Sequence, residues 1–162
     1  MDIRAAKPRD FPSLLRLNKE SEHFLSPLTA DRLELLFNEA AYRRAVDVSG
    51  EVVAFLLAFR EGSSYDSINY RWFDKQFERF LYIDRVVVSN AFQGRGIGKI
   101  LYNDIFAFAR YTEARRLVCE FDIDPPNEAS RRFHERYGFT EVGTQAVAGG
   151  KKIVSLQAAL LR

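Results

Sequence analysis

The residues with the clearest chemical potential lie in "FQGRGIGK" (92–99), a glycine-rich loop between the apolar run "RVVV" and the periodic segment "ILYNDIFAFA". The run predicts a strand and the periodic segment a helix, so the glycines stand at a helix N-terminus. That end of a helix carries N–H groups without intrahelical acceptors and roughly half a positive charge. Because glycines also let an anion approach the backbone closely, the loop predicts an anion-binding site.

Two common phosphate-binding patterns do not fit this loop. The dinucleotide fingerprint G-x-G-x-x-G fails because Gly94 and Gly96 are followed by Gly98 one position too early. The P-loop pattern fails because Gln93 stands where its first glycine belongs and Ile100 where its hydroxyl belongs. The pattern that remains is Q-x-x-G-x-G.

The elements that position the loop follow from hydrophobic periodicity and turn signals. We expect strands over residues 3–6, 45–48, 51–59, 80–88, 116–123, 139–147 and 151–161, and helices after Asp10, after Thr29, at the glycine loop and over 127–137. The strands 45–48 and 51–59 should form an antiparallel hairpin around Ser49-Gly50. This order predicts a mixed α/β fold with helices on both faces of one sheet.

The first helix is expected to use Asp10 as its N-cap. Its apolar residues Phe11, Leu14 and Leu15 should face inward, with Leu17 at the edge of that stripe.

Residues 60–79, "REGSSYDSINYRWFDKQFER", are too polar for a pair of strands and too long for an ordinary connection. We expect a long loop whose aromatic side chains either cover the structure or lie over a ligand.

Composition places the chain among single-domain proteins, with one domain over 1–162 and 47% hydrophobic residues to form its core. The net charge of +2 comes from 24 basic and 22 acidic residues spread along the chain, which indicates no nucleic-acid partner. The single cysteine, Cys119, cannot form an internal disulfide, and the N-terminus lacks the apolar stretch of a signal peptide or membrane span. We therefore expect a cytoplasmic protein without a membrane partner.

The Q-x-x-G-x-G loop resembles the signature of the GNAT superfamily of acetyl-CoA-dependent N-acyltransferases. "IRAAKPRDFPSLLRL" resembles the opening strand and helix of that family, "VVVSNAFQGRGIGKILY" its central motif, and "NEASRRFHERYGFTEVG" its later helix. The resemblance covers nearly all of the chain. It implies a single, mostly antiparallel mixed sheet of about seven strands with splayed central strands, and acetyl transfer from acetyl-CoA to an amine without a metal.

The resemblance also implies where the cofactor binds. Its diphosphate would lie on the glycine loop, formed by Gln93, Gly94, Arg95, Gly96, Ile97, Gly98 and Lys99. Its pantetheine arm and thioester carbonyl would meet backbone groups of Val86, Val87 and Val88, whose side chains we expect in the core. Asn127 would reach the coenzyme arm, although Ser130 stands where the family has alanine.

Direct attack by an amine requires its neutral form, and for a lysine-like amine deprotonation at pH 7 costs about 4 to 5 kcal/mol. Asp84 is the first candidate base because strand alternation places it on the face of Tyr82, Val86 and Val88. The alternative for Asp84 is an ion pair with an arginine. Glu120 is the second candidate, and water could also relay the proton.

The family places a tyrosine on the later helix, in a pattern like F-Y-x-x-x-G-F, to protonate the leaving thiolate. Here the residues are "FHERYGF", and His134 occupies that place. An imidazole with a pKa of about 6.5 is partly protonated at pH 7 and can donate a proton. Tyr137 is a second candidate, and His134 could instead be a surface residue of the helix. We expect His23 to be an exposed loop or helix-end residue.

In the resembling fold the acceptor site would be built by the turn "LSPL" around Ser26 and by the segment 60–79. The residues that could enclose a small amine or amino acid there are Tyr65, Asp66, Tyr70 and Trp72, with Asp66 opposing its charge. The alternative for Trp72, Phe73 and Phe77 is packing onto the sheet.

Two other functions stay open at this stage. The chain could bind acetyl-CoA as a non-catalytic sensor or regulatory domain, or it could be a scaffold whose glycine loop binds nothing. A homodimer is possible.

Overall fold

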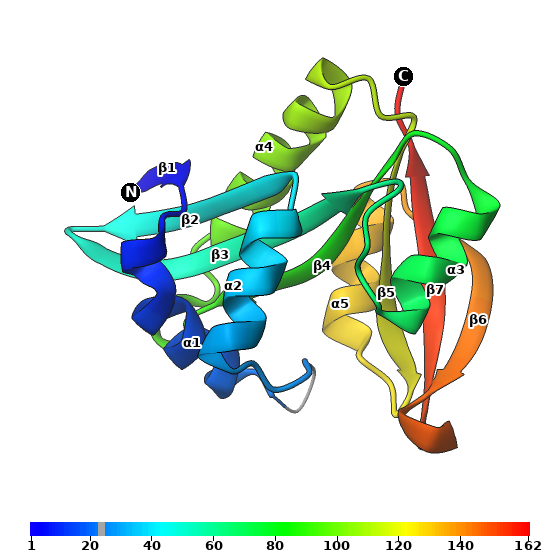
Figure 1. The fold of residues 1–162 in the computed structure, drawn as a ribbon, viewed down its shortest axis with the longest axis horizontal. Coiled ribbons are helices and arrows are strands. Elements are labelled where there is room, and N and C mark those ends of the chain that lie inside the picture. The colour runs from blue at the N-terminus through cyan, green and yellow to red at the C-terminus, as the bar shows by residue number, and fades with distance from the viewer. Residues whose placement is uncertain (23–24) are drawn as a thin grey trace. The chain divides into compact units, whose positions relative to one another are not determined.

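The computed structural model describes residues 1–22 and 25–162 (Figure 1). His23 lies outside the described residues. Within the described part, seven strands form one mixed sheet in the order β1-β2-β3-β4-β5-β7-β6, with helices flanking it. This confirms the predicted fold class. The chain forms two compact units, Met1–Phe59 with Ile83–Ala107, and Arg60–Tyr82 with Phe108–Arg162. The prediction of a single domain stays a prediction.

The first unit is built on antiparallel pairing. β1 (Asp2–Ala5) pairs with β2 (Tyr42–Val48), and β2 pairs with β3 (Glu51–Arg60) across the predicted Ser49-Gly50 turn. The end of β4 (Phe80–Val88) and the start of α4 (Ile97–Tyr111) also belong to this unit. The hairpin was predictable because its turn and both strands are adjacent in sequence.

Helices α1 (Phe11–Glu20) and α2 (Ala30–Glu39) lie on one face of β2 and β3 (Figure 1). Their buried residues share one apolar cluster with the strands: Ala6, Leu14, Leu17, Leu33, Phe37, Ala45, Val52, Phe55, Leu57 and Val87. On the alternate face of β2, Tyr42 donates a hydrogen bond to Asp104 of α4 at 2.6 Å. Helices therefore cover both faces of the hairpin, as strand alternation requires.

Two details of α1 differ from the prediction. Leu17 is only 1% exposed, so it lies in the core and not at the edge of the apolar stripe. Asp10 makes no side-chain cap to α1, because its carboxylate accepts hydrogen bonds from the Lys7 N–H and from Arg4 instead. The cap predicted for α2 is confirmed, since the Thr29 hydroxyl accepts the Arg32 N–H at 3.1 Å.

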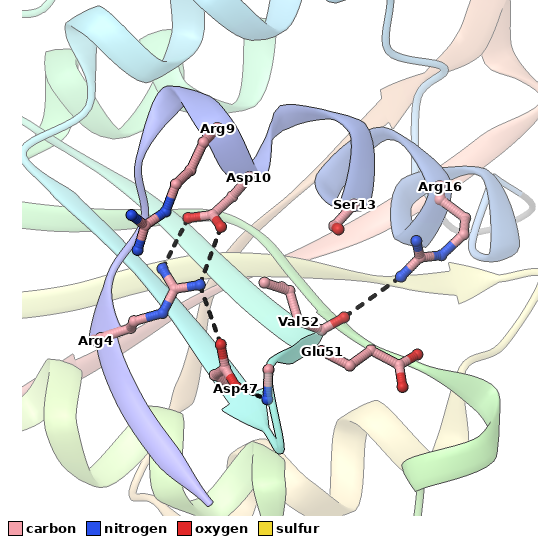
Figure 2. A pocket seen from close by; sticks show the side chains of 9 residues that line it. Arg4, Arg9, Asp10, Ser13, Arg16, Asp47, Glu51 and Val52 are labelled. Carbon is pink, nitrogen blue, oxygen red and sulfur yellow. Dashed lines mark hydrogen bonds and ion pairs between the residues drawn. The ribbon is translucent and has the colours of Figure 1, made fainter.

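The Asp10 carboxylate belongs to a polar pocket of about 560 Å³ beside α1 and the β2–β3 hairpin (Figure 2). Arg4 lies between two carboxylates there, with two hydrogen bonds to Asp10 at 2.8 and 3.0 Å and one to Asp47 at 3.3 Å. Asp47 also accepts the Gly50 N–H of the hairpin turn at 2.7 Å. This network connects β1, the start of α1 and the hairpin.

Asp10→Asn should lower the free energy of unfolding at pH 7 by about 1 to 3 kcal/mol, because it removes the charge that Arg4 pairs with. The hydrogen bonds from Arg4 lower the pKa of Asp10. A carboxyl group with a lowered pKa in the folded state stabilises the protein at pH values above its pKa in the unfolded chain, which is about 4. This stability is lost as the pH falls through the folded pKa. Urea unfolding at pH 7 and at about pH 2.5 should therefore show the difference between wild type and variant shrinking at the lower pH.

Asp31→Asn is the matched control, since Asp31 is an exposed carboxylate in the first turn of α2. An equal loss of stability in the two variants, or a difference that does not depend on pH, would contradict the role of the Arg4–Asp10 pair.

The second unit contains β5 (Arg116–Asp124), β6 (Thr140–Val147) and β7 (Lys152–Leu160), with β7 antiparallel to both neighbours. The start of β4 pairs in parallel with β5, from Phe80 opposite Arg116 to Tyr82 opposite Val118. The predicted splaying of the central strands stays a prediction.

The sequence predicted a long loop over residues 60–79, and this prediction is wrong. The segment contains helix α3 (Ile68–Gln76). The Ser67 hydroxyl caps this helix by accepting the Tyr70 N–H. Tyr70 and Phe73 are fully buried, so the helix is held by aromatic packing and not by its weak intrinsic propensity. Trp72 packs so closely on β6 that a Cβ at Gly143 would lie 2.7 Å from its ring.

Register places α3 and α5 (Glu128–Arg136) on opposite faces of the second unit. Glu120 and Gly143 both stand opposite Leu156, and this face receives Trp72 of α3. Phe121, the next residue of β5, points to the other face and contacts His134 of α5. Glu120 therefore lies on the face that α3 covers.

Candidate active site

The glycine loop has the geometry that its sequence predicts. β4 ends at Val88, where the Ser89 N–H donates to the Val53 carbonyl at 2.8 Å, and α4 begins at Ile97. Gly94 and Gly96 have φ angles of +78° and +79°, which side-chain-bearing residues rarely adopt. A Cβ at either glycine would meet no atom within 4 Å. Both glycines therefore face open space, which leaves room for an anion to approach their backbone.

The side chains of the loop leave this space accessible. Ile97 is buried and anchors the first turn of α4, whereas Gln93, Arg95 and Lys99 are exposed. The Gln93 amide donates to the Asn90 side chain at 3.3 Å, and the Arg95 guanidinium lies 4.7 Å from the centre of the Phe92 ring. The loop thus presents backbone N–H groups and positive charge to an anion.

The valines of β4 alternate as expected for a strand. Val87 is buried in the core of the first unit, and Val86 and Val88 are half-buried.

Asp84, the first candidate base, forms a buried ion pair with Arg85, whose Nε lies 2.6 Å from Asp84 Oδ2. The two side chains are 5% and 4% exposed. This is the structural arrangement that the sequence left open as the alternative. Arg85 also donates to Asn18 Oδ1 at 3.0 Å and to the Ser26 hydroxyl at 3.3 Å.

Glu120, the second candidate base, is half-buried and accepts a hydrogen bond from the Tyr82 hydroxyl. The distances from that hydroxyl to Oε1 and Oε2 are 2.5 and 3.1 Å. Tyr82 itself is 1% exposed, and its ring packs against Tyr65, Tyr70 and Phe73. A rigid aromatic cluster therefore fixes the donor that orients this carboxylate.

The residues predicted for the acceptor site lie in different surroundings. Tyr70 is fully buried, and its hydroxyl donates to the Arg60 carbonyl at 2.6 Å and accepts the Ser63 N–H. Tyr65 is 8% exposed within the same cluster. Trp72 is half-buried, while Asp66 and Ser26 are exposed. The exposed and half-buried members are the ones that a ligand can reach.

His134 is buried, at 6% exposure, so it is not a surface residue of α5. Its ring lies against Phe121, Phe133 and Phe139. Burial lowers its pKa, which favours the neutral imidazole. Its Nδ1 lies 2.7 Å from the Ser130 carbonyl oxygen, so this nitrogen carries the proton in the neutral ring.

Tyr137 follows α5 directly and is half-buried, and burial raises the pKa of its hydroxyl. Asn127 is the N-cap of α5, where its side-chain oxygen accepts the Ser130 N–H at 3.3 Å. Cys119 is buried, and burial raises the pKa of its thiol well above the usual range. A thiol in this state is a poor nucleophile.

In the described residues, no group of three or more histidine, cysteine, aspartate and glutamate side chains could hold a metal ion. Nor does any helix in the described residues have the length and apolar character needed to cross a membrane.

Sequence reasoning missed Arg85, Asn18 and Tyr82. Strand alternation places Arg85 between Ile83 and Val87 on an inward face, and this signal marks it as a buried charge that needs partners. For Tyr82 and Asn18 no comparable local signal exists.

The fold and the loop define an acyltransferase of the GNAT type, and comparison with known proteins agrees. The family model described as "Acetyltransferase (GNAT) family" matches residues 9–139. The chain therefore belongs to this family, as the sequence motifs predicted.

Among curated proteins, the chain is similar to a phosphinothricin N-acetyltransferase of Streptomyces coelicolor, with 41% identity over 66 residues. The match covers 41% of this chain and 37% of the length of that relative.

Among solved structures, Ard1 from Thermoplasma volcanium superposes with a TM-score of 0.79 at 20% identity, over 98% of this chain and 97% of that one. A ribosomal-protein-alanine N-acetyltransferase from Brucella melitensis gives a TM-score of 0.77 at 22% identity, over 99% and 100%. At such identities the likeness is one of fold.

Proposed function

We propose that the protein transfers the acetyl group of acetyl-CoA to the amine of a small, amino-acid-like molecule. The observation that carries this proposal is the open glycine loop at the start of α4, in a chain that belongs to the GNAT family. In this reaction the amine nitrogen bonds to the acetyl carbon, the carbon–sulfur bond breaks, and the amine gives up one proton while coenzyme A leaves as a thiol.

The cofactor diphosphate would be held by the backbone of Gly94 to Lys99, with Arg95 adding charge. Backbone groups of Val86 to Val88 would receive the coenzyme arm, and Asn127, the N-cap of α5, stays a predicted contact of that arm. Bound acetyl-CoA supplies the activated thioester, and the chain supplies orientation and proton transfer.

We infer that Glu120, and not Asp84, accepts the proton of the amine. The Asp84 carboxylate is engaged in a buried ion pair with Arg85. Glu120 is half-buried, and its carboxylate accepts a hydrogen bond from the Tyr82 hydroxyl, which orients it. A carboxylate held in this way can receive a proton directly or through one water.

For the leaving thiolate we favour Tyr137 over His134 as the proton donor. The lowered pKa of His134 leaves little imidazolium at pH 7, whereas the raised pKa of Tyr137 keeps its hydroxyl protonated. A thiol with a pKa of about 8.5 leaves readily, so the contribution of an acid is modest.

Tyr137→Phe should therefore lower kcat about tenfold at pH 7.5. His134→Asn should leave kcat within about threefold, because the asparagine amide can replace the Nδ1–H donor to Ser130. Steady-state rates from pH 6 to 9 measure both effects. If the wild-type kcat fell with rising pH between 6 and 7 and His134→Asn abolished that dependence, His134 would be the acid.

The small-molecule acceptor is supported by the name of the curated relative, a phosphinothricin N-acetyltransferase. The exposed Asp66 could oppose the charge of an amine, and Ser26, Tyr65 and Trp72 stay the other predicted acceptor residues. Of the predicted residues, the fully buried Tyr70 is the least accessible to a ligand.

A thiol-release assay with acetyl-CoA tests the proposed function. The amine panel should contain amino acids, phosphinothricin, polyamines and a peptide with an N-terminal alanine. Release of thiol that depends on a small amine supports the proposal. Transfer to the peptide alone would contradict the small-molecule acceptor and indicate a protein N-terminus instead. Tight acetyl-CoA binding without transfer to any amine would indicate a sensor.

A further inference from the structure

Arg85 and its neighbour Asp84 are the two charged residues of β4, and Arg85 lies between Ile83 and Val87 on the inward face of the strand. Its side chain is 4% exposed. Taking a guanidinium out of water is costly unless charge and hydrogen bonds compensate for it. The contacts of Arg85 therefore show what this residue is used for.

Arg85 connects β4 to two other segments of the first unit. Its Nε pairs with Asp84, one terminal nitrogen donates to Asn18 of α1 at 3.0 Å, and the other donates to the Ser26 hydroxyl at 3.3 Å. Asn18 is 1% exposed, and its amide nitrogen donates to the Ser26 carbonyl at 3.1 Å. The side chain and the carbonyl of Ser26 are thus both held by this network.

Ser26 itself is exposed, although the two residues that hold it are buried. The turn 25–28 around it belongs to no helix or strand, and its first residue is tied to the end of α1 by the Leu25 N–H, which donates to the Ser21 carbonyl at 2.9 Å. A planar guanidinium with several donors in fixed directions is well suited to fixing such a turn. The side-chain contacts to Ser26 come from Arg85 of the central strand and from Asn18 of α1, which Arg85 also holds.

We propose that Arg85 is a positioning residue that fixes the Ser26 turn, and with it one wall of the acceptor site, from the central strand β4. This inference rests on the proposed function, in which the Ser26 turn contributes to the acceptor site. Arg85 acts through Ser26 and does not touch the substrate.

A double-mutant cycle with two substitutions, read out by steady-state kinetics, tests the proposal. Arg85→Lys keeps a positive charge for Asp84 but loses the terminal nitrogen that donates to the Ser26 hydroxyl. Ser26→Ala removes the hydroxyl that accepts this hydrogen bond. Each should raise KM for the amine about tenfold, with Kd for acetyl-CoA within about twofold of wild type. In the double variant, KM for the amine should exceed that of the more impaired single variant by no more than about twofold.

Arg4→Lys is the matched control, because Arg4 also bridges three segments of the first unit but does not contact the Ser26 turn. It should destabilise the protein without changing KM for the amine. Effects of Arg85→Lys and Ser26→Ala that multiply, or an equal rise of KM in Arg4→Lys, would overturn the proposal.

A second measurement separates this inference from the proposed function. Amide hydrogen exchange at Leu25, whose N–H donates to the Ser21 carbonyl at 2.9 Å, should be at least about tenfold faster in Arg85→Lys than in wild type, and unchanged in Arg4→Lys. If wild type transfers no acetyl group, the proposed function fails while exchange still tests the positioning role. If transfer occurs but exchange and KM are unchanged, the positioning role fails and the function stands.

Discussion

Glu120→Gln should lower kcat about a hundred- to a thousandfold, while Kd for acetyl-CoA should change by less than about twofold. Loss of a general base typically costs this much, because the amine must then lose its proton to water. Glutamine has nearly the same shape, and its carbonyl oxygen can still accept the Tyr82 hydroxyl, so the aromatic cluster should keep its packing. Thiol release under saturating acetyl-CoA, with the amine that the screen identifies, measures the loss.

Glu141→Gln provides the control for this result. Glu141 lies on β6 and accepts the Ser155 hydroxyl at 2.6 Å, so it is also a strand carboxylate hydrogen-bonded to a hydroxyl. Its substitution should leave kcat within about threefold. If Glu120→Gln retained wild-type kcat, and Asp84→Asn lost activity while hydrogen exchange at Leu25 stayed unchanged, Asp84 would be the base in spite of its ion pair.

The parts of the fold that were predictable depend on neighbours in sequence. The Ser49-Gly50 turn lies between two apolar strands, and Thr29 stands three residues before the N–H that it caps. The glycine loop belongs to the same class, because its backbone conformation and its place before α4 are both local properties. For this reason the cofactor loop could be located from sequence while the catalytic groups could only be narrowed to candidates.

Helix α3 was missed for a physical reason. The helix has only nine residues, and most of them are polar, so its apolar stripe is too short to give a clear helical periodicity in the sequence. Its stability comes from Tyr70 and Phe73 packing in an aromatic cluster with Tyr82, and from Trp72 packing against β6 at Gly143. Tertiary contacts of this kind outweigh a weak helix propensity, and no sequence pattern in the segment predicts them.

The environment of the candidate residues also depends on distant partners. Tyr82 and Glu120 are separated by 38 positions, and Arg85 and Asn18 by 67. Strand alternation could propose Asp84 and Glu120 as bases, but only the arrangement of the strands and of α1 shows which carboxylate is engaged by an arginine. The burial of His134 among three aromatic rings is likewise a property of the fold and not of the helix sequence.

Gly96→Ala should weaken acetyl-CoA binding about thirtyfold, which corresponds to about 2 kcal/mol. The φ angle of +79° is unfavourable for alanine, and the new methyl group would project into the open space where the diphosphate is proposed to lie. The strain is also present in the free protein, so the methyl group is the main cause of weaker binding, and kcat at saturating acetyl-CoA should change much less than Kd because neither effect reaches the reacting atoms. Isothermal titration with coenzyme A measures the affinity without requiring an acceptor.

Gly150→Ala separates backbone strain from loss of the binding surface. Gly150 has a φ angle of +86° in the turn before β7, and a Cβ there would also meet no atom within 4 Å. This variant should lose a similar amount of stability on heating but keep wild-type affinity for coenzyme A. If the two variants bound coenzyme A equally well, the open space over Gly96 would not be the diphosphate site, and the assignment of the glycine loop would have to be abandoned.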